Sequence, residues 1–311
     1  MIWVGWRQQR TETIVAAAIL ALLAAVLVPT GLQMASAYHR DGLSGCSAYT
    51  NSPGCATALQ SFVGRFAQVS SLGGWLTLLP GLFGVLLAAP FVMQFESGAY
   101  RLDWTQSITR RRWIAGKLGL AIAAAVVAAV VFIELVTWWR TPWVHLYGRY
   151  QDGTFDSEGI VAIGYVLFAL GLGLAVGVLW RRAVPALIVS FVGYFAARIF
   201  VNTWLRQRLV SPETLTWHPP NNQPGVIARA WVISMGPSDR LGHYLHPHLG
   251  RCPGSLGGSI CVHAGPTAGY MHAVFEPASH FWSLQLAEFG AFAGAALVLI
   301  AFAAWWTARR V

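Results

Sequence analysis

The sequence has few charged residues for its length. Asp, Glu, Lys and Arg make up 11% of the 311 residues, whereas hydrophobic residues make up 56%. Soluble proteins average about 25% charged residues. The low charge and the long apolar runs therefore exclude an ordinary soluble domain and predict an all-α polytopic membrane protein.

Several motifs that carry chemistry are also absent. The sequence contains no G-x-x-x-x-G-K-[ST] phosphate loop, so we do not expect the chain to bind ATP by that route. No Ser-His-Asp or metal-hydrolase spacing stands out. No His lies inside a predicted membrane span, which argues against a haem held between helices. We therefore predict a non-catalytic chain without a cofactor of its own.

Three neighbouring histidines are the best metal candidate: His243, His246 and His248. Pro247 breaks any helical register between them, and no carboxylate neighbours them closely. Such runs usually belong to solvated surface loops, and binding of zinc or copper is the alternative. We predict no metal site and keep the three residues as weak candidates.

Six apolar runs are long enough to cross a hydrocarbon core of about 30 Å at about 1.5 Å per residue. The expected helices cover residues 14–34, 71–95, 113–139, 159–180, 183–204 and 282–306. Pro80 is expected to kink the second helix. Residues 1–204 then hold five helices, residues 205–281 form a loop-rich extracytoplasmic cap, and residues 282–311 form the last helix and a basic tail.

The distribution of charge predicts the orientation. One membrane face collects eleven basic residues against three acidic ones, and the other has nine Arg against seven acidic residues. The first set is Arg7, Arg10, Arg101, Arg110, Arg111, Arg112, Lys117, Arg181, Arg182, Arg309 and Arg310. An excess of Lys and Arg marks the cytoplasmic side, so both termini are expected there. The same bias explains the net charge of +9 without nucleic acid.

All four cysteines fall in the loops assigned to the other side. Cys46 and Cys55 are separated by eight residues, and so are Cys252 and Cys261. Four cysteines allow three pairings. We favour the two local disulfides, which suit an oxidising exterior, with free thiols as the alternative.

Three ionisable residues lie inside the predicted spans: Glu134, Arg198 and Glu288. Charges in hydrocarbon are costly, so such residues face the bundle interior and pair. All three are expected in the outer third of the membrane. They form either a structural ion cluster or a gate or substrate contact. The spans are otherwise poor in polar groups, which favours an amphipathic or lipophilic cargo. Gly173-x-x-x-Gly177 and Gly290-x-x-x-Gly294 are expected to allow close helix approach.

The stretch Glu96–Trp113 separates two of the apolar runs. Positive-inside topology alone accounts for Arg110–Arg112. It does not account for the mixed polar and aromatic residues before them, which include Asp103 and Trp104. Leu102 to Ile108 can form a short amphipathic helix along the membrane, and such an element can dock into a partner.

These segments resemble a known family. ESGAYRLDWTQSITRRRWIAGKLG, WRQQRTE near the N-terminus and EPASHFW before the last helix are similar to segments of bacterial ABC type-2 exporter permeases. The resemblance implies a bacterial plasma-membrane protein that pairs as a homodimer or heterodimer. It also implies two cytoplasmic ATPase subunits, which hold ATP and Mg. The loop that corresponds to Glu96–Trp113, called the coupling loop below, would hold a coupling helix on the cytoplasmic side. The residues that would contact or brace the ATPase are Glu96, Arg101, Trp104, Gln106, Arg110 and Arg111.

We therefore predict the transmembrane subunit of an ATP-driven exporter, with the ATPase on a separate chain. The external segment of about 77 residues is longer than the simplest members of the wider family require. It is either a cap over the exit or a binding element. The alternative is a sensor subunit whose cap binds a ligand without transport. A membrane-embedded enzyme is disfavoured because no catalytic set stands out.

Overall fold

The structure is a computed structural model that describes residues 2–48, 53–98, 109–150, 153–218, 225–245, 248–251, 260–263 and 269–310. Its long helices are α1 (Ile2–Arg40), α2 (Pro53–Leu76), α3 (Leu79–Ser97), α5 (Arg110–Tyr147), α7 (Val161–Trp180), α8 (Ala183–Phe200) and α11 (Phe281–Arg310). Shorter helical pieces are η1 (Leu43–Gly45), α6 (Thr154–Ser157), the π-helix η2 (Val201–Leu205), α9 (Arg206–Leu209), α10 (Gly225–Ala228) and η3 (Ala278–His280).

Within the described residues, six helical stretches are long and apolar enough to cross a membrane. They are Arg10–Arg40, Leu79–Ser97, Arg110–Tyr147, Val161–Trp180, Ala183–Leu209 and Ala278–Arg310. They coincide with the six predicted spans, so the predicted fold class is confirmed. At about 1.5 Å per residue, the 38 residues of α5 make a helix about 57 Å long, longer than a bilayer core requires.

The second span differs from its prediction. Residues 53–76, assigned to a loop and the start of a helix, form α2. The chain turns at Thr77 and Leu78, and Pro80 then lies in the first turn of α3. A proline in a first turn removes no intrahelical hydrogen bond and already has a helical φ. Pro80 therefore marks a break between two helices, not a kink within one.

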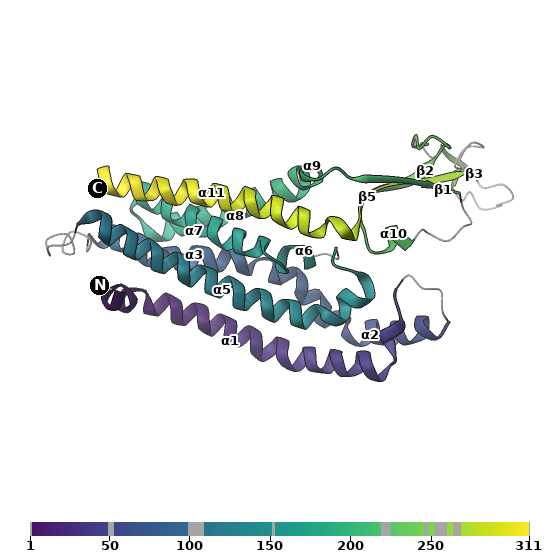
Figure 1. Cartoon of the computed structure of the whole chain (residues 1–311), viewed down its shortest axis with the longest axis horizontal. Coiled ribbons are helices and arrows are strands. Elements are labelled where there is room, and N and C mark those ends of the chain that lie inside the picture. Colours follow the sequence, from purple (N-terminus) through teal and green to yellow (C-terminus); the bar gives the residue numbers. More distant parts are fainter. Residues whose placement is uncertain are drawn as a thin grey trace.

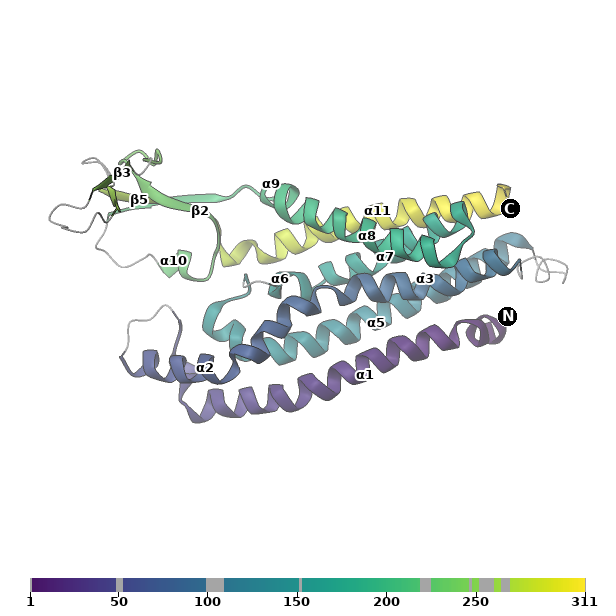
Figure 2. The ribbon, with the colours of Figure 1, turned by 180° about the vertical axis from the view of Figure 1, so that it is seen from behind.

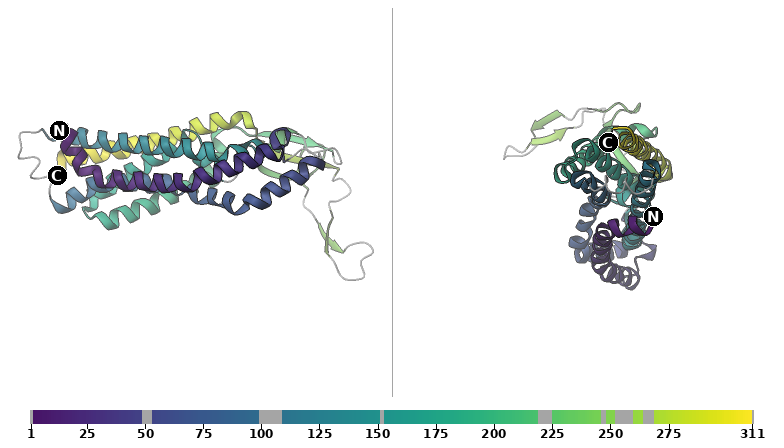
Figure 3. Two further views of the ribbon diagram at one scale, coloured as in Figure 1. Left: turned by 90° about the horizontal axis from the view of Figure 1, so that it is seen from below. Right: turned by 90° about the vertical axis from the view of Figure 1, so that its left-hand side faces the viewer.

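The helices form an elongated bundle with both ends of the chain at one end (Figure 1). α3 and α7 are the most buried spans and pack against each other. α1 packs against α5, and α8 and α11 pack against α7. Viewed from the end that carries the termini, α1 and α2 lie on one side of this centre and α8 and α11 on the other (Figure 3, right). The starts of α5 and α8 and the end of α3 share that end (Figure 2).

Glycines explain how closely α3 and α7 approach. A Cβ on Gly84 would lie 2.3 Å from the Val166 carbonyl oxygen, and one on Gly177 would lie 2.3 Å from a Val92 methyl group. The predicted close approach at Gly173 and Gly177 is therefore confirmed. A Cβ on Gly290 or Gly294 would meet no described atom within 4 Å, so that pair makes no close approach in this chain.

Gly84→Ala is expected to destabilise the bundle by about 1–3 kcal/mol, because the new methyl group meets backbone that cannot move without separating α3 from α7. Gly116→Ala is the matched control, since a Cβ there meets open space. Thermal unfolding in lipid nanodiscs measures both variants. Equal unfolding temperatures for the two would contradict this account of the packing.

The Cys46–Cys55 disulfide is present and ties the end of η1 to the start of α2. This prediction is confirmed. Cys252 lies outside the described residues, so the predicted Cys252–Cys261 pair stays a prediction.

The segment between α9 and α11 lies at the end of the bundle opposite the termini (Figure 1). It was predicted as loop-rich, but it contains strands. β1 (Glu213–Trp217) and β2 (Trp231–Ser238) flank β5 (Tyr270–Glu276) in an antiparallel sheet. β3 (His248–Arg251) pairs with β4 (Ile260–His263). The register Trp231↔Glu276 places the start of β2 beside the end of β5, close to the beginning of α11.

Candidate functional site: a buried ion network beside a cavity

Four ionised side chains meet near the end of the bundle that carries the sheet. Arg206 donates from Nε to Glu288 Oε2 at 2.7 Å and from Nη2 to Asp156 Oδ1 at 2.5 Å. Arg198 Nη2 lies 2.8 Å from Asp156 Oδ2. Glu288 is fully buried, and the other three are at most 9% exposed. Two positive and two negative groups leave this ion network with no net charge.

Two buried tyrosines extend the network. The Tyr165 hydroxyl donates to Glu288 Oε1 at 2.5 Å, and Arg198 Nη1 donates to the Tyr194 hydroxyl at 3.4 Å. The guanidinium carbon of Arg198 lies 3.8 Å from the centroid of the Tyr165 ring. The network thus connects α6, α7, α8, α9 and α11, and the position of each element depends on the others.

The π-helix η2 explains how both arginines reach one carboxylate. Arg198 and Arg206 are eight residues apart, about 2.2 turns of a regular α-helix, which would leave them on different faces. A π-helix closes its hydrogen bonds from i to i+5 and so takes up about one extra residue. The remaining seven residues make about 1.9 turns, close to a whole number. Both guanidiniums therefore face Asp156.

The charges stabilise one another. Burial raises the pKa of the Asp156 carboxyl, but the guanidiniums of Arg198 and Arg206 outweigh it, and the pKa lies below its usual value. Asp156 is therefore ionised at neutral pH. Removing one member would leave an uncompensated charge in a dry environment, which costs far more than an exposed ion pair contributes.

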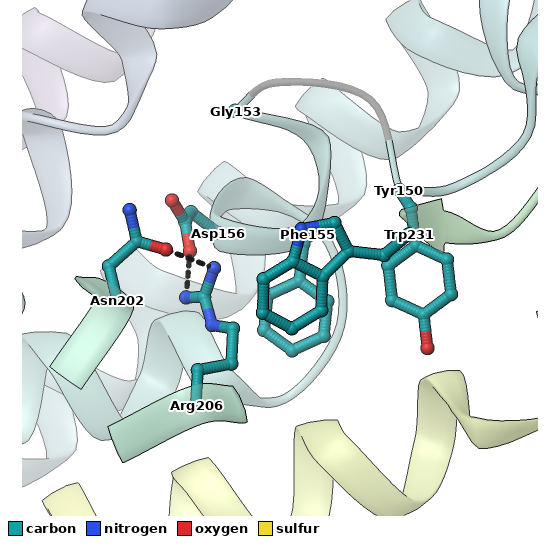
Figure 4. Close-up of a pocket in the computed structure, with 7 residues that line it drawn as sticks. All are labelled: Tyr150, Gly153, Phe155, Asp156, Asn202, Arg206 and Trp231. Atoms are coloured by element: carbon teal, nitrogen blue, oxygen red, sulfur yellow. Dashed lines mark hydrogen bonds and ion pairs between the residues drawn. The ribbon is translucent and has the colours of Figure 1, made fainter. Parts of the chain in front are cut away.

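A cavity of about 230 Å³ lies against this network. It is lined by Tyr150, Gly153, Phe155, Asp156, Asn202, Arg206 and Trp231. Figure 4 shows Asn202, Asp156 and Arg206 on one side and the rings of Tyr150, Phe155 and Trp231 on the other. Trp231 comes from β2, so the sheet segment contributes one wall.

The structure brings two of the three residues of the predicted ion cluster into one network. Arg198 and Glu288 come together, but Glu134 is exposed on α5 and takes no part in the network. Its place is taken by Asp156 and Arg206. Sequence reasoning missed both because each lies just outside an apolar run. The spacing of Arg198 and Arg206 amounts to two helical turns only when the π-helix is included, and the sequence gives no signal for that π-helix.

The predicted coupling residues are only partly described. Arg101, Trp104 and Gln106 lie outside the described residues. Arg110 and Arg111 are exposed in the first turn of α5. Glu96, near the end of α3, accepts a hydrogen bond at 2.9 Å from the backbone N–H of Ala183, the first residue of α8. A carboxylate at a helix N-terminus stabilises that helix, so Glu96 braces α8 within this chain.

The structure describes only part of the histidine run. His243 Nδ1 lies 3.0 Å from Asp239 Oδ2, four residues earlier, which is a local pair. His246 lies outside the described residues, and His248 begins β3. The described residues contain no group of three His, Cys, Asp or Glu side chains placed to hold a metal ion.

Glu158 is a second buried carboxyl group near this site. It lies between α6 and α7, is 4% exposed, and its Oε1 has no hydrogen-bond partner among the described residues. Burial raises the pKa of Glu158 from 4.5 to about 7, and the charges of Arg140 and Arg149 offset only part of this. The folded state therefore disfavours the ionised form.

Glu158→Gln is expected to stabilise the protein at pH 8 by up to about 3 kcal/mol. Above pH 4.5 the unfolded chain ionises this group, whereas the folded chain resists ionisation up to pH 7, so the wild type loses stability as the pH rises through this window. At pH 4.5 and below, the two proteins should be equally stable. Unfolding measured from pH 4.5 to 8 tests this, and a constant difference at all pH values would contradict it.

Comparison with known proteins identifies the family of the chain. Residues 17–206 match the family model described as ABC-2 membrane transporter related. No curated protein and no solved structure matches the chain. The match covers more than half of the chain, from the first membrane helix to Arg206 of the ion network. It agrees with the resemblance seen in the sequence and with the six candidate spans. The chain belongs to the ABC-2 membrane transporter-related family and is a multi-pass membrane protein of the permease type.

Proposed function

We propose that the chain is the permease subunit of an ATP-driven exporter that moves an amphipathic or lipophilic substrate outward. Two permease subunits pair, and each docks a separate cytoplasmic ATPase. The basic residues at the end that carries the termini support a cytoplasmic location for that end. They include Arg110–Arg112, Arg181, Arg182, Arg309 and Arg310. The sheet segment then lies outside the cell.

One observation carries the mechanism: α8 is held at both of its ends by groups that a transport cycle can move. Its first residue, Ala183, is bonded to Glu96 beside the proposed coupling loop. Its last turn carries Arg198, and the π-helix continues it to Arg206. A displacement of α3 by the ATPase would pull on α8 and reach the ion network about 35 Å away, at about 1.5 Å per residue.

The ion network then acts as the outer gate. It holds α6, α7, α8, α9 and α11 together in the closed state of the gate. Breaking the Arg206 contacts with Asp156 and Glu288 would separate α9 from α11. Because the network is neutral, an amphipathic substrate would pass it without meeting a fixed net charge.

A sensor subunit is the second candidate. The wall that β2 contributes to the cavity favours it, because a ligand bound there would touch the sheet segment directly. In that case ligand binding would change ATP hydrolysis without movement of the ligand across the membrane.

Proteoliposomes containing the complex with its ATPase separate the two. An NBD-labelled alkyl glycoside and an NBD-labelled phospholipid serve as probes, and ATP is added on the ATPase side. The exporter predicts ATP-dependent movement of at least one probe away from that side, together with faster ATP hydrolysis. Faster hydrolysis without movement would support the sensor. The absence of both movement and faster hydrolysis would refute the proposed function.

A further inference from the structure

The cavity beside the ion network has the chemistry of a ligand site. Three aromatic rings form one wall, from Tyr150, Phe155 and Trp231. The rings of Tyr150 and Phe155 are nearly parallel, with an interplanar angle of 10°. Aromatic faces of this kind bind the apolar faces of flat or ring-shaped groups. The rings come from three parts of the chain, so the wall depends on the folded sheet segment as well as the bundle.

Each wall of the cavity presents a hydrogen-bond donor, Asn202 on the polar side and Trp231 on the aromatic side. Asn202 uses its Oδ1 to accept from Arg206 Nη1 at 2.6 Å, which directs its amide N–H₂ group away from Arg206. Asn202 is exposed. Among the described residues neither that N–H₂ group nor the Trp231 indole N–H has an acceptor. Burial and the charge of Glu276 raise the pKa of Tyr150 far above its usual value, so its hydroxyl stays protonated, and it donates to the Pro277 carbonyl oxygen at 3.5 Å. The free polar groups, the Asn202 N–H₂ and the Trp231 N–H, are therefore both donors.

Charge and size limit the ligand further. The two guanidiniums and two carboxylates of the ion network cancel, so a ligand with a net charge gains no net attraction. A volume of about 230 Å³ is below the usual range for drug-sized ligands, about 300–1,000 Å³, and suits one ring. A longer apolar tail would have to lie outside the cavity. Exposed apolar side chains of α8 and α11, such as Phe200 and Trp282, supply a surface for it.

We propose that this cavity binds a neutral ring bearing hydroxyl or carbonyl groups, as the headgroup of an amphipathic molecule. The inference deepens the proposed function, because it names the substrate class that would meet the outer gate. The ring stacks on the aromatic wall, and its oxygens accept hydrogen bonds from Asn202 and Trp231.

Binding to the purified full-length permease in nanodiscs, without any ATPase, tests this. Calorimetric titrations with hexyl β-glucoside, methyl β-glucoside, hexyl phosphate and hexyltrimethylammonium are corrected with empty nanodiscs. We expect hexyl β-glucoside to bind more tightly than either charged amphiphile. If methyl β-glucoside binds as tightly as hexyl β-glucoside, the sugar ring alone is the ligand. If methyl β-glucoside binds more weakly, the ligand is the amphipathic molecule, ring and alkyl chain together. Tighter binding of a charged probe, or no binding of either glucoside, would overturn the proposal.

Three variants locate the site. Trp231→Phe keeps the ring and loses the N–H donor, so binding of hexyl β-glucoside should weaken about five- to tenfold, the effect of one hydrogen bond. Trp180→Phe, at an exposed tryptophan at the far end of α7 that does not line the cavity, is the control and should not change binding. Asn202→Asp keeps the acceptor for Arg206 but adds a negative charge, so it should admit hexyltrimethylammonium.

Unfolding temperatures identify any variant that fails to fold. Unchanged glucoside binding in both folded site variants would overturn the proposal. The result does not depend on transport: a complex that fails to move any probe refutes the exporter, whereas loss of glucoside binding refutes only this site.

Discussion

Arg206→Met is expected to lower the free energy of unfolding by about 3–5 kcal/mol, because it leaves Glu288 without a counter-charge in a buried site and leaves Asp156 with one of its two guanidinium partners. The matched control is Arg208→Met. Arg208 lies two residues further along α9, is exposed and contacts the Trp204 ring and backbone. Surface changes of this kind usually stay within about 0.5 kcal/mol.

A double variant separates the loss of charge balance from the loss of side-chain volume. Arg206→Met with Glu288→Gln removes one positive and one negative charge, and the amide oxygen of the new side chain still offers the Tyr165 hydroxyl an acceptor. The remaining Arg198–Asp156 pair is neutral. We therefore expect the double variant to be more stable than Arg206→Met alone. If the losses of stability caused by Arg206→Met and by Glu288→Gln simply add in the double variant, the ion network does not hold this end of the bundle together. The same conclusion follows if Arg208→Met lowers the stability as much as Arg206→Met does.

Trp104→Ala with Arg111→Ala is expected to reduce ATP-driven transport by about tenfold without changing the unfolding temperature. Allosteric coupling between two sites is typically worth about 1–3 kcal/mol, or about 5- to 150-fold. Arg111 is exposed, so its loss removes no contact in the core of this chain. Arg309→Ala is the control, since it removes an exposed arginine at the same end of the bundle but outside the coupling loop.

Glu96 distinguishes docking from bracing in the same assay. Glu96→Gln retains an oxygen acceptor for the Ala183 N–H, whereas Glu96→Ala removes it. If Glu96 acts through α8, the Gln variant should keep most of the transport activity and the Ala variant should lose it. Equal losses in both would indicate direct contact of the carboxylate with the ATPase. Normal transport in the double variant at the coupling loop would contradict the proposed route of energy entry.

Each sequence pattern predicts only the structural property to which it is physically related. Apolar runs report the length of hydrocarbon a helix can cross, and for that reason all six spans were predictable. They do not report where α1 and α5 end, because both helices continue beyond the predicted spans, to Arg40 and Tyr147. Pro80 was ambiguous for a physical reason: the same residue kinks a helix or begins one, depending on the position of the preceding turn.

The ion network shows a second limit. Depth within a span placed Arg198 and Glu288 in the same region, but their ion-pair partners are Asp156 and Arg206, because depth says nothing about the direction in which a side chain points. Glu134 lies at similar depth and points away from the network. Direction depends on helix register, and the π turn in η2 changes the register just before Arg206. No local sequence rule predicts that turn, so Arg206 became visible only in the folded chain.

Co-purification tests the central claim most directly. The tagged permease is co-expressed with a candidate ABC ATPase, purified in nanodiscs, and weighed by native mass spectrometry. We predict a complex of two permease chains and two ATPase chains that keeps its composition in the Arg309→Ala variant and loses the ATPase when Trp104 and Arg111 are replaced. A permease that purifies without an ATPase, or that holds the ATPase equally well after the coupling loop is altered, would contradict the account.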